Sequence, residues 1–222
     1  MNGLLVIAGA TGLVGTAAVD EALRRGWRVA ALVRNPGKIR PCDNLEAIAT
    51  NFDDLPALAA GLTSRAPKAF LCALGTTIRT AGSREAFARV DRDYVAAFAQ
   101  LGAGAGAARF ALVSSAGADP ASSNFYLRVK GEAEAAVRAA GFAHIEIAWP
   151  GLLTGKREEH RIGEKIAAPV LAAFAPLMVG GLAKYRPIEA AIVARALVHA
   201  LEKPESGLFY RYYPQLRALA RT

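Results

Sequence analysis

Residues 4–15 read LLVIAGATGLVG, and this stretch joins an apolar run to a glycine-rich turn just before an amphipathic segment at 16–25. A nearly continuous apolar run predicts a strand buried on both faces of a sheet. Glycines in the turn allow a pyrophosphate to approach the backbone, and the helix that follows offers it free N–H groups and a positive dipole end. The residues expected at the phosphates are Gly9, Thr11, Gly12, Leu13, Val14 and Gly15.

Apolar runs alternate with helical patterns along the chain. Further strands are expected at 28–33, 45–50, 69–74, 109–114 and 143–148, and further helices at 55–62, 84–102, 125–140, 163–175 and 188–201. This order predicts one α/β domain over residues 1–222, built on a doubly wound, Rossmann-type parallel sheet with its ligand crevice at the carboxyl ends of the strands. Residues 150–222 are expected to form a small C-terminal helical cap on the substrate side.

The composition of the chain indicates which kind of partner it binds. The chain has 222 residues and a net charge of +8, but its basic residues are dispersed, so we expect a small-molecule substrate and neither nucleic acid nor membrane. Two cysteines without metal-ligand spacing predict no disulfide and no metal site. With no leader pattern at the start, these features favour a reduced, cytoplasmic protein, either a monomer or a homodimer.

The end of the second expected strand discriminates between two nicotinamide cofactors. An acidic residue at this place binds the adenosine ribose hydroxyls and repels a 2′-phosphate. The sequence has Arg34 there, and a guanidinium binds phosphate through two charge-assisted hydrogen bonds. NADP is therefore the expected cofactor, with NAD as the alternative; a solvated loop charge is the other interpretation of Arg34.

Three polar residues near the fifth expected strand suggest proton-transfer chemistry. Tyr126 and Lys130 are four apart on an expected helix and share a face, so the ammonium would favour the phenolate and make the hydroxyl a better proton relay. Ser115, at the end of the strand, would hold a substrate oxygen as charge develops on it. The expected catalytic residues are Ser115, Tyr126 and Lys130.

Taken together, residues 9–15, Ser115 and the Tyr126/Lys130 pair resemble the signature of the short-chain dehydrogenase/reductase superfamily, in its extended or atypical branch. The stretches CALGTT at 72–77, VDRDYV at 90–95 and SNFYLRVKGE at 123–132 are similar to the Tat-interactive-protein oxidoreductase family. The similarity covers residues 4–165 and weakens in the C-terminal cap.

The resemblance implies further cofactor contacts. The adenine would be flanked by Asn51 and Phe52, the ribose and phosphates by the 74–76 turn, and the nicotinamide ribose by residues 150–153. These last two groups are Leu74, Gly75, Thr76, Pro150, Gly151, Leu152 and Leu153. Asn51 stands where the superfamily usually has an aspartate. Asp91 stands where extended members carry an asparagine, and we assign it no catalytic role.

The leading functional hypothesis is hydride transfer to or from a small carbonyl or alcohol substrate. A regulatory protein that senses NADP(H) is the alternative from another class, because the fold alone does not determine function. Epimerase or dehydratase chemistry on a nucleotide sugar is less favoured, since the region after residue 150 is short. The charge run at 157–161 is interpreted as a solvated loop, or as a lip over the substrate.

Overall fold

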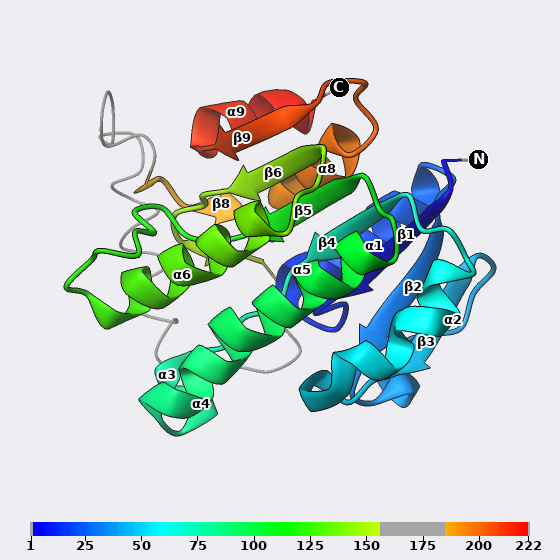
Figure 1. The fold of residues 1–222 in the computed structure, drawn as a ribbon. Helices are drawn as coiled ribbons and strands as arrows, with labels where there is room; N and C mark the ends of the chain where they lie inside the picture. Colours follow the sequence, from blue (N-terminus) through cyan, green and yellow to red (C-terminus); the bar gives the residue numbers. More distant parts are fainter. Residues whose placement is uncertain (1, 156–184, 222) are drawn as a thin grey trace.

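The computed structural model of the protein describes residues 2–155 and 185–221. Within them the main element is a seven-stranded parallel sheet in the order β3-β2-β1-β4-β5-β6-β9 (Figure 1). Its strands are β1 (Leu4–Ala8), β2 (Arg28–Val33), β3 (Leu45–Ala49), β4 (Ala69–Cys72), β5 (Arg109–Val113), β6 (His144–Ala148) and β9 (Gly207–Arg211). The chain starts at the centre, winds to one edge and then to the other, so the sheet is doubly wound as expected.

Helices cover both faces of this sheet (Figure 1). One face carries α5 (Tyr94–Gly104) and α6 (Phe125–Ala139), and the other carries α1 (Leu13–Arg24) and α8 (Ala190–Ala200). The shorter elements are η1 (Pro36–Lys38), η2 (Phe52–Leu58), α2 (Ala59–Thr63), α3 (Ile78–Ala81), α4 (Arg84–Ala88), η3 (Arg89–Asp93) and α9 (Tyr213–Leu219), with β7 (Leu153–Thr154) paired to β8 (Ile188–Glu189).

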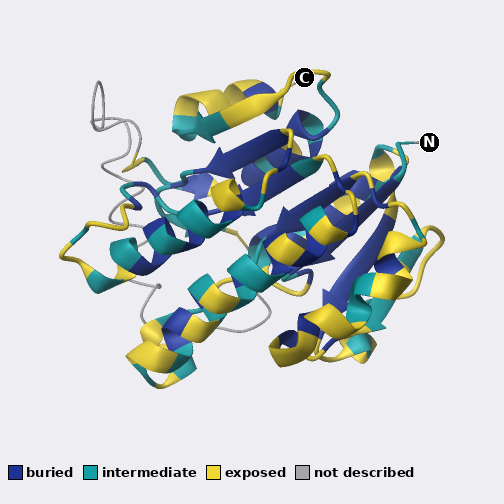
Figure 2. Cartoon of the chain, viewed as in Figure 1, coloured by how far each residue is buried: buried dark blue, intermediate teal, exposed yellow. Residues whose placement is uncertain are grey.

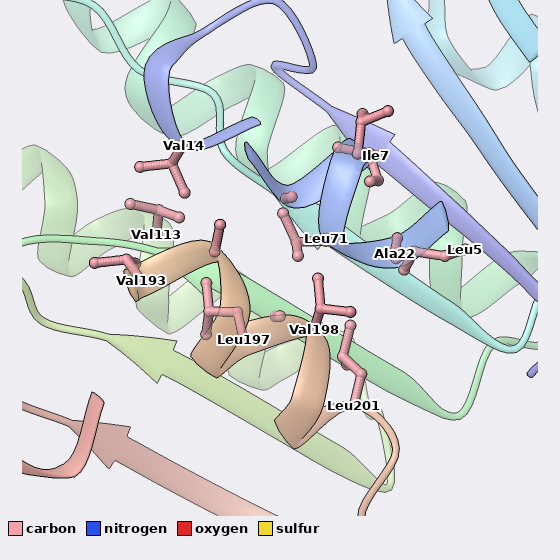
Figure 3. Close-up of a cluster of buried hydrophobic side chains, with 14 of the residues drawn as sticks. Leu5, Ile7, Val14, Ala22, Leu71, Val113, Val193, Leu197, Val198 and Leu201 are labelled. Atoms are coloured by element: carbon pink, nitrogen blue, oxygen red, sulfur yellow. The ribbon is translucent and has the colours of Figure 1, made fainter. Parts of the chain in front are cut away.

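The core has two layers because successive side chains of a strand point to opposite faces. In β1, Leu5 and Ile7 pack with α1 and α8, whereas Leu4 and Val6 pack on the side of α5 and α6. The inner strands of the sheet are almost entirely buried, whereas the edge strands β3 and β9 are partly exposed, and further exposed residues lie on the helices (Figure 2). Figure 3 shows how α8 adds Val193 and its neighbours to the first layer.

All six expected strands are present, each within two residues of its expected end. The expected helix at 84–102 is divided into α4, a π-helical turn at η3 and α5. A π-turn accommodates one extra residue, which shifts the face that the following residues present. Amphipathic periodicity alone does not reveal such a shift.

The C-terminal segment differs most from expectation. We expected residues 150–222 to form mostly a cap, but α8 packs under the centre of the sheet and β9 adds a seventh strand beside β6. The run at 207–211 belongs to the segment expected as a cap, and its own pattern did not predict a strand because all its residues are exposed or half-buried at the edge of the sheet. Residues 156–184 of the expected cap, with the helix at 163–175 and the charge run at 157–161, lie outside the described residues.

Candidate functional site

The glycine-rich turn follows the carboxyl end of β1, which is paired with β2 on one side and with β4 on the other. Gly9 has φ +81°, and a Cβ there would lie 2.5 Å from the carbonyl carbon and oxygen of Ala73. A Cβ at Gly15 would overlap the Gly9 carbonyl oxygen. Both glycines are therefore required by the close packing of the turn against α1 and against the chain after β4.

Gly12 has a different role. It is exposed, and a Cβ would meet only the Gly9 oxygen, at 3.3 Å, so its small size leaves open space above the turn. Gly12 is also the N-cap of α1, whose first turn receives no side-chain hydrogen bond from it. The N–H groups at the start of α1 can therefore donate to an anion such as a diphosphate, and Gly12 leaves space for it. These residues fit a dinucleotide.

The turn after β4 meets a buried ion pair. Asp91, in η3, is 1% exposed; its Oδ2 accepts a hydrogen bond of 2.8 Å from the backbone N–H of Thr76. Its Oδ1 lies 2.8 Å from Nζ of Lys130, whose side chain is 8% exposed. Gly75 lies against the pair, with an added Cβ 3.5 Å from the carboxylate and 3.8 Å from the ammonium. This arrangement brings the expected 74–76 turn and Lys130 together.

Lys130 keeps its charge despite its surroundings. Burial alone would lower the pKa of Lys130, but the negative charge of Asp91 and the nearby Tyr126 hydroxyl outweigh burial and raise it. The neighbouring thiol of Cys72 is neutral, because burial raises its pKa to about 12. The ammonium is thus a fixed positive charge beside the expected ribose position.

Helix α6 positions Tyr126 in its first turn, one turn before Lys130. Asn124 caps the helix, its Oδ1 accepting a hydrogen bond of 3.2 Å from the N–H of Leu127. The ring of Tyr126 packs on Phe87 with centroids 5.7 Å apart, while the residue stays 37% exposed. The phenol is therefore held by its ring and accessible to a substrate.

The two serines after β5 have different roles. Ser114 is buried and its hydroxyl donates to Oε1 of Glu134, which also accepts a hydrogen bond of 2.7 Å from the indole of Trp149. Ser115 is half-buried and begins the loop that leads from β5 to α6. Within this loop, the N–H of Asp119 donates a hydrogen bond of 3.1 Å to the carbonyl of Leu127 in α6. Ser115 is thus the more exposed of the two serines.

The chain after β6 lies next to this loop, because the N–H of Ala116 donates to the carbonyl of Pro150 at 3.1 Å. A Cβ at Gly151 would lie 2.5 Å from the carbonyl oxygen of Tyr185, so glycine permits a close crossing. Leu152 and Leu153 continue into the pairing of β7 with β8. The residues expected at the nicotinamide ribose are therefore adjacent to Ser115.

The expected adenosine end lies at the carboxyl ends of β2 and β3. Arg34 is exposed directly after β2, and Asn51 is exposed after β3, where its side chain caps η2. Phe52 is buried, with its ring 5.7 Å from that of Tyr94. The Tyr94 hydroxyl donates to Asp53 at 2.7 Å. Burial raises the pKa of Tyr94, and the charge of Arg34 acts in the opposite direction.

Sequence reasoning named Asp91 only as a departure from the family pattern, without a role, and it did not name Glu134 or Tyr94. Asp91 is spaced by four from Phe87 and from Val95, so it lies on the apolar face of its helical segment. A charge on a buried face requires a partner, and that signal was present in the sequence. The partners of Glu134 and Tyr94 come from distant segments and left no such signal.

Two further features of the described parts of the chain concern other classes of site. No group of three or more His, Cys, Asp or Glu residues there is arranged to hold a metal ion. None of the helices at 2–155 and 185–221 is long and apolar enough to cross a membrane.

Comparison with known proteins identifies the family of the chain. The sequence model of a family described as NAD(P)H-binding matches residues 9–204. Protein fmp52, mitochondrial, of Aspergillus fumigatus is 34% identical over 208 residues, covering 91% of this chain and 88% of the fungal protein. Protein HTATIP2 of Rattus norvegicus is 41% identical over 136 residues, covering 61% of this chain and 54% of the rat protein, so the match spans about half its length.

Solved structures share the fold at low identity. The Bordetella bronchiseptica enzyme WbmH in complex with NAD+ has a TM-score of 0.71 at 15% identity, covering 95% of this chain and 75% of that one. A UDP-glucose 4-epimerase from Thermotoga maritima has a TM-score of 0.70 at 15% identity, covering 98% and 81%. At such identity the likeness concerns the fold alone.

The relatives contradict the expected cytoplasmic location, since the fungal proteins are named as mitochondrial. The expectation was wrong because its evidence was weak: unpaired cysteines fit any reducing compartment, and a targeting address is not determined by the fold. The family model matches residues 9–204, which is most of the chain, and the named relatives and the doubly wound sheet agree with it. The chain therefore belongs to the NAD(P)H-binding family, within the atypical short-chain dehydrogenase/reductase superfamily.

Proposed function

We propose that the protein is an NADP-linked oxidoreductase that acts on a small carbonyl or alcohol. The observation that carries the proposal is the placement of an accessible phenol, Tyr126, one helical turn before a buried and charged Lys130. A buried ion pair contributes little to stability by itself, because the cost of taking both charges out of water offsets their attraction. Such a charge is useful where a neighbouring hydroxyl must release a proton.

The roles of the side chains follow from their positions. Tyr126 delivers a proton to the substrate oxygen in reduction and accepts it in oxidation. Lys130 favours the phenolate electrostatically and donates hydrogen bonds to the ribose hydroxyls of the cofactor. Ser115 orients the substrate oxygen by hydrogen bonding. When bound, the nicotinamide supplies or accepts the hydride at the substrate carbon.

The preference for NADP rests on Arg34, which is exposed at the end of β2. Its guanidinium favours a 2′-phosphate, whereas the carboxylate nearest along the chain after β3, Asp53, is already engaged by Tyr94 at 2.7 Å and by Arg89 at 2.8 Å. An engaged carboxylate repels the added phosphate less than a free one does.

The test is single-turnover absorbance of NADPH with a panel of small aldehydes and ketones. We expect Tyr126→Phe to keep cofactor affinity and to lose turnover by roughly 10²–10⁴-fold, the usual contribution of general acid–base catalysis. The matched control is Tyr213→Phe, which removes a half-buried phenol from α9. Equal turnover in wild type and Tyr126→Phe would remove the catalytic role. Binding of NADPH without turnover of any compound would favour a cofactor-sensing protein instead.

A further inference from the structure

Asp91 is the one carboxylate in contact with Lys130 among the described residues, and it belongs to a different segment. It also holds the turn after β4 through the N–H of Thr76. One buried side chain therefore connects the helix that carries Tyr126 to the turn expected beside the cofactor ribose. We infer that Asp91 is a positioning residue, which fixes the Lys130 ammonium and the Thr76 backbone relative to each other at the ribose site.

The local backbone supports a dedicated role. Asp91 lies within η3, where the helix between α4 and α5 widens into a π-turn. Turns of this kind cost stability and are frequent at functional sites. Two residues further along the same turn, Asp93 is half-exposed and pairs with Arg92 at 2.7 Å. Thus the π-turn presents one carboxylate inward and one outward.

The charges around Lys130 leave Asp91 as its main counter-ion. The groups that act on it are Asp91 from η3, Tyr126 and Glu134 from its own helix, and Cys72 from the end of β4. Burial raises the pKa of Cys72 to about 12, so this thiol is neutral, and burial also raises the pKa of Glu134, whereas Asp91 is in direct contact with Lys130 at 2.8 Å. A buried ammonium without a negative partner loses its proton more readily.

Asp91→Asn keeps the size of the side chain and an acceptor for Thr76 but removes the charge. In this variant the folded state would hold the Lys130 proton less tightly than the unfolded chain does. The unfolded state would then bind more protons, so stability would rise with pH below the ordinary lysine pKa of 10.5. Cofactor binding should follow the opposite trend, because a neutral amine is a weaker partner for the ribose hydroxyls.

The experiment measures the melting temperature and the NADPH dissociation constant at about pH 7 and about pH 9, between the ordinary histidine and lysine pKa values. For Asp91→Asn we expect the melting temperature to rise with pH, while NADPH affinity falls about tenfold, as for one lost hydrogen bond to a charged group. Asp93→Asn is the matched control and should show neither trend beyond that of wild type.

The inference rests on the proposed function only in requiring a bound dinucleotide, so its readouts are binding and melting rather than turnover. If wild type binds NADPH but reduces nothing, the catalytic proposal fails and this test still applies. The positioning role would be overturned if the NADPH dissociation constant of Asp91→Asn changed with pH in the same way as that of Asp93→Asn. Should Asp91→Asn fail to fold at both pH values, Asp91→Glu, which keeps the charge, must fold and bind NADPH; if it does neither, the inference is wrong.

Discussion

The two ends of the candidate cofactor site differ in how their charges are held. At the catalytic end, Lys130 and Asp91 are buried together, with side chains 8% and 1% exposed. At the adenosine end, Arg34 is exposed, and no ion pair of its side chain is found within the described residues. Packing therefore fixes the positions of the Lys130 and Asp91 charges, whereas the exposed Arg34 side chain becomes ordered when it binds its ligand.

This difference predicts how strongly each end depends on single residues. A buried ion pair is sensitive, because losing one partner leaves the other charge without solvent or counter-ion. An exposed cation contributes through a ligand contact that salt weakens. Substitutions of the buried pair should therefore affect folding and binding together, while those at the adenosine end should affect only the choice of cofactor.

The largest effect is expected for Lys130→Met. Removing the ammonium leaves the Asp91 carboxylate buried and unpaired, which should lower the free energy of unfolding by about 3–5 kcal/mol. Binding of both NADPH and NADH should also weaken, because the ribose is common to them. Urea denaturation and fluorescence titration measure the two effects. Lys38→Met, at an exposed lysine, is the control; a Lys130→Met protein as stable as this control would contradict a coupled buried pair.

An intermediate effect is expected for Arg34→Ala. The loss of one charge-assisted contact should weaken NADPH binding by about 1.5–3 kcal/mol and leave NADH binding and stability unchanged. The difference between the cofactors should shrink as salt is added, because the contact is exposed. Titrations at low and high ionic strength measure it, with Arg40→Ala as a nearby exposed control. If wild type binds the two cofactors equally, Arg34 does not select between them.

The smallest effect is expected for Glu134→Gln, within the catalytic end. Burial raises the pKa of Glu134, so the folded state retains a proton that the unfolded chain releases above its ordinary pKa of 4.5. This residue's contribution to stability is complete below pH 4.5 and is lost as pH rises through the folded pKa. Glutamine should remove that slope. Melting temperatures from acid to neutral pH measure it, and Glu132→Gln, at a half-exposed carboxylate, should keep the wild-type profile.

Local sequence was sufficient to predict most strands and helices, and also the motifs whose residues are close together in the chain. The run 4–8, the turn and α1 are adjacent in the chain, and continuous apolar residues identify the buried strands. Tyr126 and Lys130 share a helix face by spacing alone. These predictions depend on the spacing of apolar residues and on the residue types of the turns, so they do not require contacts between segments that are distant in the sequence.

The tertiary structure decided which polar residues meet and where the last strand lies. Asp91 acquires a role only because η3 packs against α6 and the turn after β4. Ser114 and Ser115 are neighbours in sequence, and the hydrogen bond from Ser114 to Glu134 gives them different surroundings in the structure. The strand β9 is short and half-exposed, and it is identified by pairing with β6 rather than by its own pattern. Such long-range pairing depends on how the chain packs, which local periodicity does not encode.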